Sequence, residues 1–571
     1  MRGRFWVAAL AAASPILLFG AVLGTSAFAQ ETAAAEDADD PNAGGPAPAD
    51  QAAGQNGSIP APAEPAPQAT TPADDAGQSE GTPPSTTTVQ TVPIPAAATP
   101  IVASIRTKLA DPAFRGKASA EDIAALEAFY NGRSEPVWMT DMGFSREGLA
   151  AIDEILEADD WGLASGAFDL PSSSTLPPSV DEQARGEIEL DLAILKYARH
   201  ARGGRTDPDK LKNNHMVPTF RDPKIVLAEI ADAAEPDLYL QSLHPKHEQF
   251  HRLRQALLKA RAEAEAGAKP RNTQKILINM ERWRWMPEDL GALYVQINIP
   301  EFMVYIVKNG KTIHSEKVVV GKPVYATPIF SADLKSIVFN PEWTVPSTII
   351  REDLLPRLRG GGGMFGGNTS VLKKHELNVN YNGKRVNPSS INWNTVNMGA
   401  ISFTQAPGPK NVLGKVKFLY PNRHSVYMHD TIKRELLSLQ VRAEGHHCPR
   451  VANPGKVAAI ILAEDSGVPQ AEIDKLLAKG YNSGVAIRNR VPVHTTYFTL
   501  SADPEGKLQS FGDLYGLDAG VAAAVLGKQA KPEAVADNVE AKSEPKPKPK
   551  PSTVGSASPP PAPGFTGSIP Q

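Results

Sequence analysis

Apolar residues in the first half of the chain recur at helical spacing. Between residues 101 and 268 they stand three or four positions apart, as on one face of a helix. One run follows Ser119, a good helix-capping residue, and another ends at Gly203-Gly204, where glycine is typical of a helix end. We expect Trp138 and Trp161 in the core. The four runs are Ile123, Leu126, Phe129 and Tyr130; Leu149, Ile152, Ile155 and Leu156; Ile188, Leu192 and Leu195; and Phe250, Leu253 and Leu257. The pattern predicts a helical scaffold domain over residues 101–272.

The period of the pattern changes near residue 275. Leu293, Val295, Ile297 and Ile299 alternate at period two, as in a half-buried strand. Asn309-Gly310 separates two apolar runs, which is a strong signal for a β-hairpin. Further strands are expected at residues 336–339, 415–419 and 425–428. We therefore predict a mostly β domain over residues 273–520, and the fold class α+β for the whole chain.

Residues 347–397 interrupt the strand pattern of this second domain. They contain a short helical run over residues 349–358, a glycine run at 360–363, and turns rich in asparagine and glycine. A long insertion of this kind is typical of a lid over a functional site. A surface loop without function is the alternative, and the pattern alone does not decide between them.

Both ends of the chain have a composition that does not favour folding. Residues 30–100 are rich in alanine and proline, residues 530–571 in lysine, proline and serine, and 23 of the 51 prolines lie in these flanks. We predict a disordered tether and a disordered tail. The tail's Lys-Pro repeats could contact anionic polymers, but a solvated tail is the simpler interpretation.

The first 29 residues are typical of an export signal. Arg2 and Arg4 precede an apolar stretch over residues 5–24, and Ala27-Phe28-Ala29 offers a cleavage site before Gln30. We predict a signal peptide over residues 1–29 and a periplasmic location. The apolar stretch is also long enough for an uncleaved inner-membrane anchor. A net charge of −4 in 571 residues argues against a nucleic-acid partner.

The chain has one cysteine, Cys448. In an exported protein such a thiol is buried and inert, pairs with another chain, or is reactive. His429 lies 19 positions upstream, and on a strand it shares a face with Tyr427. An imidazole beside the thiol can take its proton and stabilise a thiolate. Arg450 could bind a substrate carboxylate, and the backbone N–H groups of His447 and Cys448 could stabilise an oxyanion.

A metal site is the competing interpretation of this region. Its ligands would be His424, His429, His446, His447 and Cys448. The usual pair spacings of zinc ligands are missing, and adjacent residues rarely bind one ion together. We therefore expect neither a metal nor another cofactor.

Several ordered motifs between residues 120 and 518 make the chain similar to a known enzyme family. Beyond the cysteine segment, they are Asn279-Met-Glu-Arg-Trp-Arg-Trp285, Val318-Val-Val-Gly-Lys-Pro323, Thr327-Pro328, Phe339-Asn-Pro-Glu-Trp-Thr-Val-Pro346, Gln405-Ala-Pro-Gly-Pro-Lys-Asn411, Lys415-Val-Lys-Phe418, Tyr427-Met-His-Asp-Thr431, Arg442-Ala443, Val491-Pro-Val493 and Phe511-Gly-Asp-Leu-Tyr-Gly516. In these motifs the chain resembles the large L,D-transpeptidases of bacterial envelopes, which carry a helical scaffold domain.

The resemblance implies an acyl transfer between peptidoglycan stem peptides. Cys448 would attack the donor stem at its third residue, release D-Ala and form a thioester, and an amine of a second stem would then complete a 3→3 cross-link. His429 matches the catalytic histidine, whereas His446, Arg450 and Tyr427 match substrate-pocket positions. Carbapenems resemble the donor and are the expected inhibitors. The insertion at 347–397 falls where the family has its lid.

The nucleophile motif departs from the family pattern. The family usually has Ser-His-Gly-Cys followed by a β-branched residue, and this chain has Gly445-His-His-Cys-Pro449. His447 would be strained by about 1–3 kcal/mol if the backbone there needed positive φ. Pro449 lacks an N–H, which would cost little if Cys448 opened a helix. We expect these changes to modulate catalysis without abolishing it.

Three functions remain open at this stage. The first is the cross-linking enzyme. The second uses the same thioester but another acceptor, which is water or an amine of an outer-membrane protein, so cell-envelope protein partners are possible. The third is a cell-wall-binding protein that has lost turnover.

Overall fold

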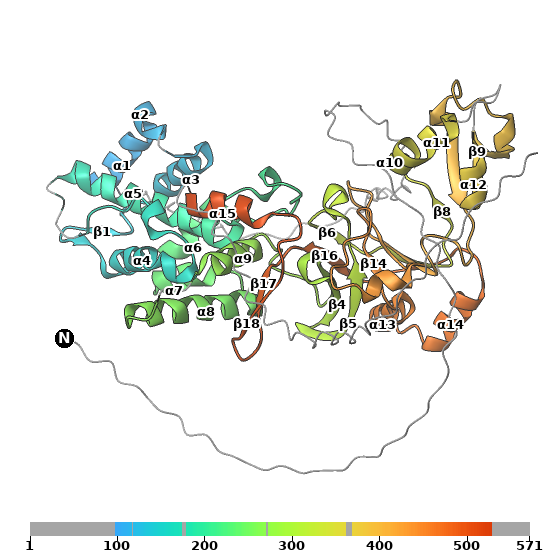
Figure 1. The fold of residues 1–571 in the computed structure, drawn as a ribbon. Coiled ribbons are helices and arrows are strands. Elements are labelled where there is room, and N and C mark those ends of the chain that lie inside the picture. The colour runs from blue at the N-terminus through green and yellow to red at the C-terminus, as the bar shows by residue number, and fades with distance from the viewer. Residues whose placement is uncertain are drawn as a thin grey trace, which may run out of the picture. The chain divides into compact units, whose positions relative to one another are not determined.

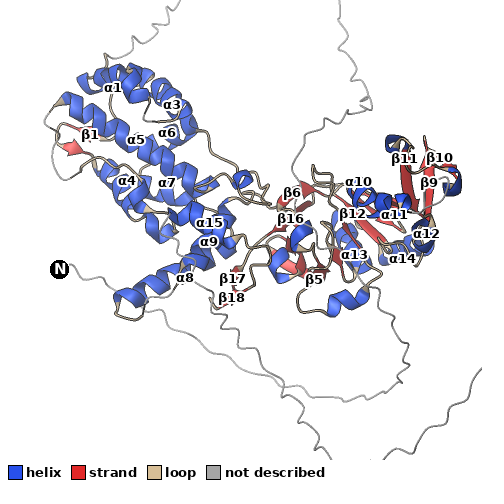
Figure 2. Cartoon of the chain, turned by 45° about the horizontal axis from the view of Figure 1, so that its top comes forward, coloured by secondary structure: helices blue, strands red, loops and turns tan. Residues whose placement is uncertain are grey.

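The structure is a computed structural model that describes residues 97–116, 118–173, 177, 179–269, 272–360 and 368–527. The predicted signal peptide, the tail and nearly all of the predicted tether lie outside these residues. Helices dominate up to about residue 284, and strands concentrate after it (Figures 1 and 2). The α+β fold class is therefore confirmed. None of the helices in the described ranges is both long and apolar enough to cross a membrane.

The first region has eight α-helices in its described part. They are α1 Pro100–Ala110, α2 Pro112–Arg115, α3 Ala120–Asn131, α4 Arg146–Leu156, α5 Val180–Gly203, α6 Pro223–Ala231, α7 Pro236–Ser242 and α8 Glu248–Glu265. The Ser119 hydroxyl caps α3 by accepting the Asp122 N–H at 3.0 Å, and α5 ends at Gly204, whose φ is 86°. These two predicted boundaries are confirmed, and Trp138 and Trp161 are buried as expected. Of the run that predicted α4, Ile152 and Ile155 are buried, whereas Leu149 and Leu156 are exposed.

A ten-stranded sheet forms the centre of the second region. Its order is β15-β7-β12-β13-β14-β5-β4-β3-β16-β6, with parallel pairing only between β13 and β14 and between β3 and β16. The strands are β3 Leu293–Asn298, β4 Met303–Lys308, β5 Lys311–Val319, β6 Phe330–Asp333, β7 Ser336–Phe339, β12 Val416–Leu419, β13 Met428–His429, β14 Arg450–Val451, β15 Ser483–Ala486 and β16 Pro492–Thr496.

Most of the predicted strands are present in this sheet. The Asn309-Gly310 hairpin joins β4 to β5, and both turn residues have positive φ, at 48° and 74°. Ile299, however, begins a short turn of 3-10 helix rather than ending β3.

The strand predicted at 425–428 is also wrong, because β13 covers only Met428 and His429. The Asn422 side chain accepts the N–H groups of His424 and Val426 and holds the preceding residues in a turn.

Helices and a small hairpin pack around the sheet. They are α9 Gln274–Arg284, α13 Pro454–Ser466, α14 Gln470–Ala478, α15 Asp518–Leu526, β17 Leu500–Ala502 and β18 Leu508–Ser510. Phe250, Leu253 and Leu257 of α8 belong to the same hydrophobic core as the sheet. The helix therefore joins the two regions, and it forms a wall beside the sheet.

The insertion between β7 and β12 is a folded subdomain. A four-stranded sheet of order β10-β9-β11-β8 is packed by short helices around a separate core that includes Trp343, Leu358, Trp393 and Phe403. Its elements are β8 Trp343–Thr344, α10 Ser347–Ile349, the π-helical turn Ile350–Leu354, α11 Leu355–Arg359, α12 Ser370–Lys374, β9 Leu377–Tyr381, β10 Lys384–Val386 and β11 Ile401–Gln405. The predicted helical run at 349–358 is confirmed. A core of its own distinguishes the insertion from an irregular surface loop.

Candidate active site

The sheet brings Cys448, His429 and Arg450 together. His429 of β13 is the register partner of Arg450 in the parallel strand β14, and its N–H donates to the Pro449 carbonyl at 3.1 Å. Register partners point to the same face of a sheet, and Cys448 stands two positions before Arg450. Cys448 therefore lies before a strand and does not open a helix. A helix at this point was the condition under which the missing N–H of Pro449 would cost little.

The loop before the nucleophile is held against the end of β5. Gly445 pairs with Gly321, its N–H donates to the Val320 carbonyl at 2.9 Å, and its own carbonyl accepts the Lys322 N–H at 2.8 Å. A Cβ on Gly321 would lie 1.9 Å from the Tyr325 carbonyl oxygen. Only glycine allows this approach, so Gly321 sets the position from which the chain enters the cysteine segment.

The environment of the Cys448 thiol contains two opposing effects. Burial raises the pKa of the thiol, whereas a backbone hydrogen bond from Tyr427 and the charges of Lys417 and Arg450 lower it. Among the described residues, neither Lys417 nor Arg450 has a carboxylate within salt-bridge distance. Two cations without a direct salt bridge beside one thiol are suited to an anion, either the thiolate or a carboxylate of a ligand.

Lys417 was not predicted from the sequence. It is the register partner of His429 on β12, and its ammonium lies 4.1 Å from the centre of the Tyr427 ring. The signal was present, because Lys417 alternates with buried Val416 and Phe418 and therefore faces away from the core. What the sequence lacked was the strand order that places this face beside Cys448.

The His429 ring is buried and uncharged at neutral pH. Burial, reinforced by the charges of Arg450 and Lys417, lowers its pKa to about 3. Its Nδ1 atom is buried without a hydrogen-bond partner among the described residues. A neutral imidazole beside a protonated thiol differs from the resting ion pair that the sequence suggested. It is still a base that can accept the thiol proton during attack.

Tyr427 links the site to the inserted subdomain. Its ring lies 5.7 Å from that of His429, as expected for residues that share a face. The Trp343 side chain hydrogen-bonds to Tyr427, and Tyr427 packs against the core of the insertion. This pair therefore connects the inserted subdomain to the residues around Cys448.

The rings of His446 and His447 turn toward the 323–327 turn. His446 stacks on Tyr325 with a centroid distance of 4.3 Å, and His447 Nδ1 hydrogen-bonds to the Ala326 carbonyl at 3.0 Å. His447 is not among the residues with positive φ, so the strain considered for this position does not occur. Neither His447 nor His429 is among the groups that shift the pKa of Cys448, whose resting pKa is set by burial, the Tyr427 backbone and the two cations.

The backbone donors considered for an oxyanion are available. Among the described residues, the N–H groups of His447 and Cys448 have no acceptor, whereas the His447 carbonyl accepts the Thr327 hydroxyl at 2.8 Å. The absence of an N–H at Pro449 costs nothing in the pairing with β13, which uses the Pro449 carbonyl. In the described part of the chain, no three His, Cys, Asp or Glu side chains gather in a way that could hold a metal ion.

A half-buried thiol, an imidazole and two cations thus lie on one mixed sheet. A family model of the L,D-transpeptidase catalytic domain matches residues 292–463, and one of the scaffold domain matches residues 124–257. The chain therefore carries an L,D-transpeptidase catalytic domain, which is of an acyltransferase family, and a scaffold domain ahead of it.

One curated relative comes from Haemophilus influenzae and is provisionally named an L,D-transpeptidase. It is 31% identical over 248 residues, which make up 43% of this chain and 48% of that protein. The chain thus matches about half the length of this relative.

Proposed function

We propose that this protein cross-links peptidoglycan by forming 3→3 links between stem peptides. The observation that supports this most directly is that Cys448 lies just before the strand pair of His429 and Arg450, with the charges of Lys417 and Arg450 acting on its thiol, in a domain of this family. A thiol is a suitable nucleophile for acyl transfer, and the neutral imidazole supplies the base that it needs.

The first half of the reaction forms a thioester. Cys448 Sγ attacks the carbonyl carbon of the third residue of the donor stem, and the thiol proton passes to His429. The N–H groups of His447 and Cys448 stabilise the oxyanion. The bond to the D-Ala nitrogen then breaks, and His429 returns the proton to that nitrogen, so D-Ala leaves with a neutral amine.

The second half transfers the acyl group. An amine of the acceptor stem attacks the thioester carbonyl and gives its proton to His429. The C–S bond breaks, and the proton returns to Cys448, so the enzyme is regenerated and one amide replaces another. Water, or an amine of an envelope protein, in the acceptor position would give the alternative products.

The two cations have separate tasks in this proposal. Arg450 binds a stem carboxylate through its planar fork, which leaves the compact Lys417 ammonium to stabilise the thiolate. The inserted subdomain acts as the lid over the bound donor, and the contact between Trp343 and Tyr427 couples it to the site. We also propose that residues 1–29 export the protein to the periplasm, where its substrate is.

A carbapenem tests the first half of the reaction. The intact protein should gain the mass of one inhibitor on Cys448, and Cys448→Ala should remain folded and unmodified. Folded natural protein that stays unmodified after long incubation would exclude the thioester mechanism. Muropeptides from cells with and without the protein then identify the acceptor: loss of 3→3 dimers supports cross-linking, loss of trimmed stems indicates water, and binding without either product indicates a wall-binding protein.

A further inference from the structure

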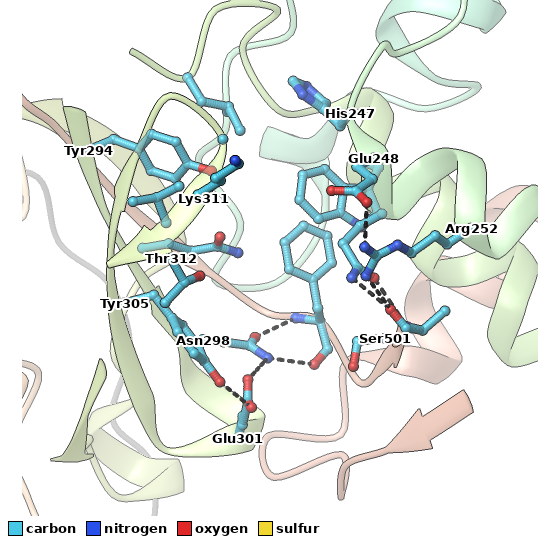
Figure 3. A pocket seen from close by; sticks show the side chains of 18 of the residues that line it. His247, Glu248, Arg252, Tyr294, Asn298, Glu301, Tyr305, Lys311, Thr312 and Ser501 are labelled. Atoms are coloured by element: carbon cyan, nitrogen blue, oxygen red, sulfur yellow. Dashed lines mark hydrogen bonds and ion pairs between the residues drawn. The ribbon is translucent and has the colours of Figure 1, made fainter. Parts of the chain in front are cut away.

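A large pocket in the described part of the chain lies away from Cys448. It has a volume of about 800 Å³ and is formed between α8, the outer face of strands β3 to β5, and the β17 segment (Figure 3). Tyr294 and Tyr305 stand on the sheet side, and Glu248 and Arg252 on the helix side (Figure 3). Pockets of about 300–1,000 Å³ hold small ligands.

Strand alternation explains why polar side chains line the sheet side of this pocket. Val295 and Ile297 of β3 point into the core, so Tyr294, Gln296 and Asn298 point outward into the pocket. The other wall is fixed, because the Gln249 amide of α8 exchanges two hydrogen bonds with the Ala502 backbone, at 2.8 and 3.1 Å. Both walls are therefore held in place before any ligand arrives.

The floor of the pocket combines two stacked, nearly buried aromatic rings with fixed acceptors. Trp283 and Phe498 stack at 4.3 Å with an interplanar angle of 13°. Asn298 donates to Glu301 at 3.1 Å, and the Tyr305 hydroxyl donates to the same carboxylate. The carboxylate is thereby oriented, and its remaining lone pairs can accept hydrogen bonds from a ligand.

One acceptor at the end of the pocket lacks a donor. Nε2 of His247 is buried and has no partner among the described residues. Burial lowers the pKa of His247 to about 4, and its ring also hydrogen-bonds to the Pro287 backbone. A neutral ring that donates through one nitrogen leaves the other as an acceptor, and this acceptor lies buried in the wall of the pocket.

The charges around the pocket argue for an uncharged ligand. Three Lys or Arg and four Asp or Glu side chains line it, so neither an anion nor a cation is favoured over its whole length. Aromatic rings beside amides and oriented carboxylates match a molecule that has apolar C–H faces and a rim of hydroxyl and amide groups. Among biological polymers, this is the chemistry of an N-acetylated sugar chain.

The pocket and the catalytic residues lie on one face of the sheet. Tyr305 is opposite Ser315 on β5, and Val319, four residues further on β5, is opposite Arg450. Alternate residues share a face, so Tyr305 and Arg450 do as well. Four residues along a strand and two strand spacings across it separate them by roughly 16 Å. A polymer with one stem at Cys448 can reach the pocket.

We propose that this pocket binds the glycan backbone of the polymer whose stem peptides reach Cys448. The choice of polymer rests on the proposed function, whereas the affinity for an N-acetylated sugar chain does not. Binding here would hold the strand while a stem enters the active site, which raises the effective concentration of the donor.

The test uses an oligomer of four β-1,4-linked N-acetylglucosamine units and the Cys448→Ala protein. Calorimetric titration should detect binding. Tyr305→Ala and Thr312→Trp, which respectively remove one wall and fill the opening, should each raise Kd at least tenfold. Tyr481→Ala, which removes an exposed tyrosine elsewhere, should leave Kd unchanged.

The same two pocket changes in the protein that retains Cys448 should leave carbapenem acylation unchanged, which also shows that they fold. The inference is overturned if the natural pocket shows no binding at millimolar oligomer, or if both variants bind as well as Tyr481→Ala. Normal acylation without sugar binding removes only this inference. Sugar binding without acylation removes only the proposed mechanism.

Discussion

Adding one methyl group at Gly321 should slow carbapenem acylation of Cys448 by about 100-fold in a protein that still folds. Gly321 lies at the end of β5. Its N–H donates to the Thr327 hydroxyl at 2.9 Å, and its carbonyl accepts the Tyr515 hydroxyl at 2.8 Å. Because both backbone groups are hydrogen-bonded, Gly321 cannot move away from the Tyr325 carbonyl without breaking one of these bonds. The perturbation therefore acts on the loop that carries the nucleophile.

The magnitude follows from the space around Gly321. An added Cβ would lie 1.9 Å from the Tyr325 carbonyl oxygen and 3.1 Å from that of His446, and real contacts do not fall below 3.0 Å. The backbone must separate by about 1 Å. A misplacement of about 1 Å in a reacting group can cost about 100-fold in rate. Overpacking costs about 1–3 kcal/mol, which a domain with about 5–15 kcal/mol of stability survives.

The assay is the rate of mass gain on Cys448 at saturating carbapenem, with Tm measured alongside. Gly484→Ala on β15 is the matched control, since nothing lies within 4 Å of its added Cβ, and it should acylate at the natural rate. Natural acylation by Gly321→Ala would refute the argument, because the loop would then have absorbed the methyl group without moving Cys448. A large fall in Tm together with loss of the folded protein would show that the substitution slows acylation by destabilising the domain instead.

Three further predictions concern the residues around the thiol. His429→Ala should lower the acylation rate by about 10²- to 10⁴-fold at neutral pH, and near-natural acylation would assign the base elsewhere. Lys417→Met should move the rise of the acylation rate to higher pH, because the thiol of Cys448 loses a nearby positive charge that lowers its pKa. Lys417→Arg should restore the natural pH profile. Identical profiles for the natural protein and both variants would show that Lys417 has no such role. His447→Gly and Pro449→Val, measured by the same acylation assay, should each change the rate by less than about tenfold, since neither natural residue is strained or costs a hydrogen bond in the pairing with β13; full rescue of a protein that otherwise cannot be acylated would show that the motif has decayed.

Local patterns predicted the parts of the fold that local physics determines. Ser119 caps a helix, Asn309-Gly310 forms a hairpin, and Tyr427 shares a face with His429, because each depends on residues close in sequence. The turn that shortens β13 also had a local cause in Asn422, but a side chain that replaces ladder hydrogen bonds leaves no mark on the hydrophobic pattern.

The strand order could not be predicted in the same way. Lys417 is 31 residues from Cys448 in sequence, and only the β12-β13-β14 order brings its charge to the thiol. The same holds for β16, which lies between β3 and β6 although nearly 200 residues separate it from β3. The resemblance identified the residues of the motif, but it did not show which charges surround them.

The departures from the family motif show why a motif must be judged by its surroundings. Glycine is required where φ is positive or where a neighbour leaves no room for Cβ, and at position 447 φ is not positive. The His447 side chain points to the Ala326 carbonyl, which fixes the loop by a hydrogen bond that glycine would not make. Pro449 supplies its carbonyl, the group that pairing with His429 uses. Gly321 and Gly445 retain the close backbone approach, so the constraint that keeps Cys448 in place lies in these two glycines.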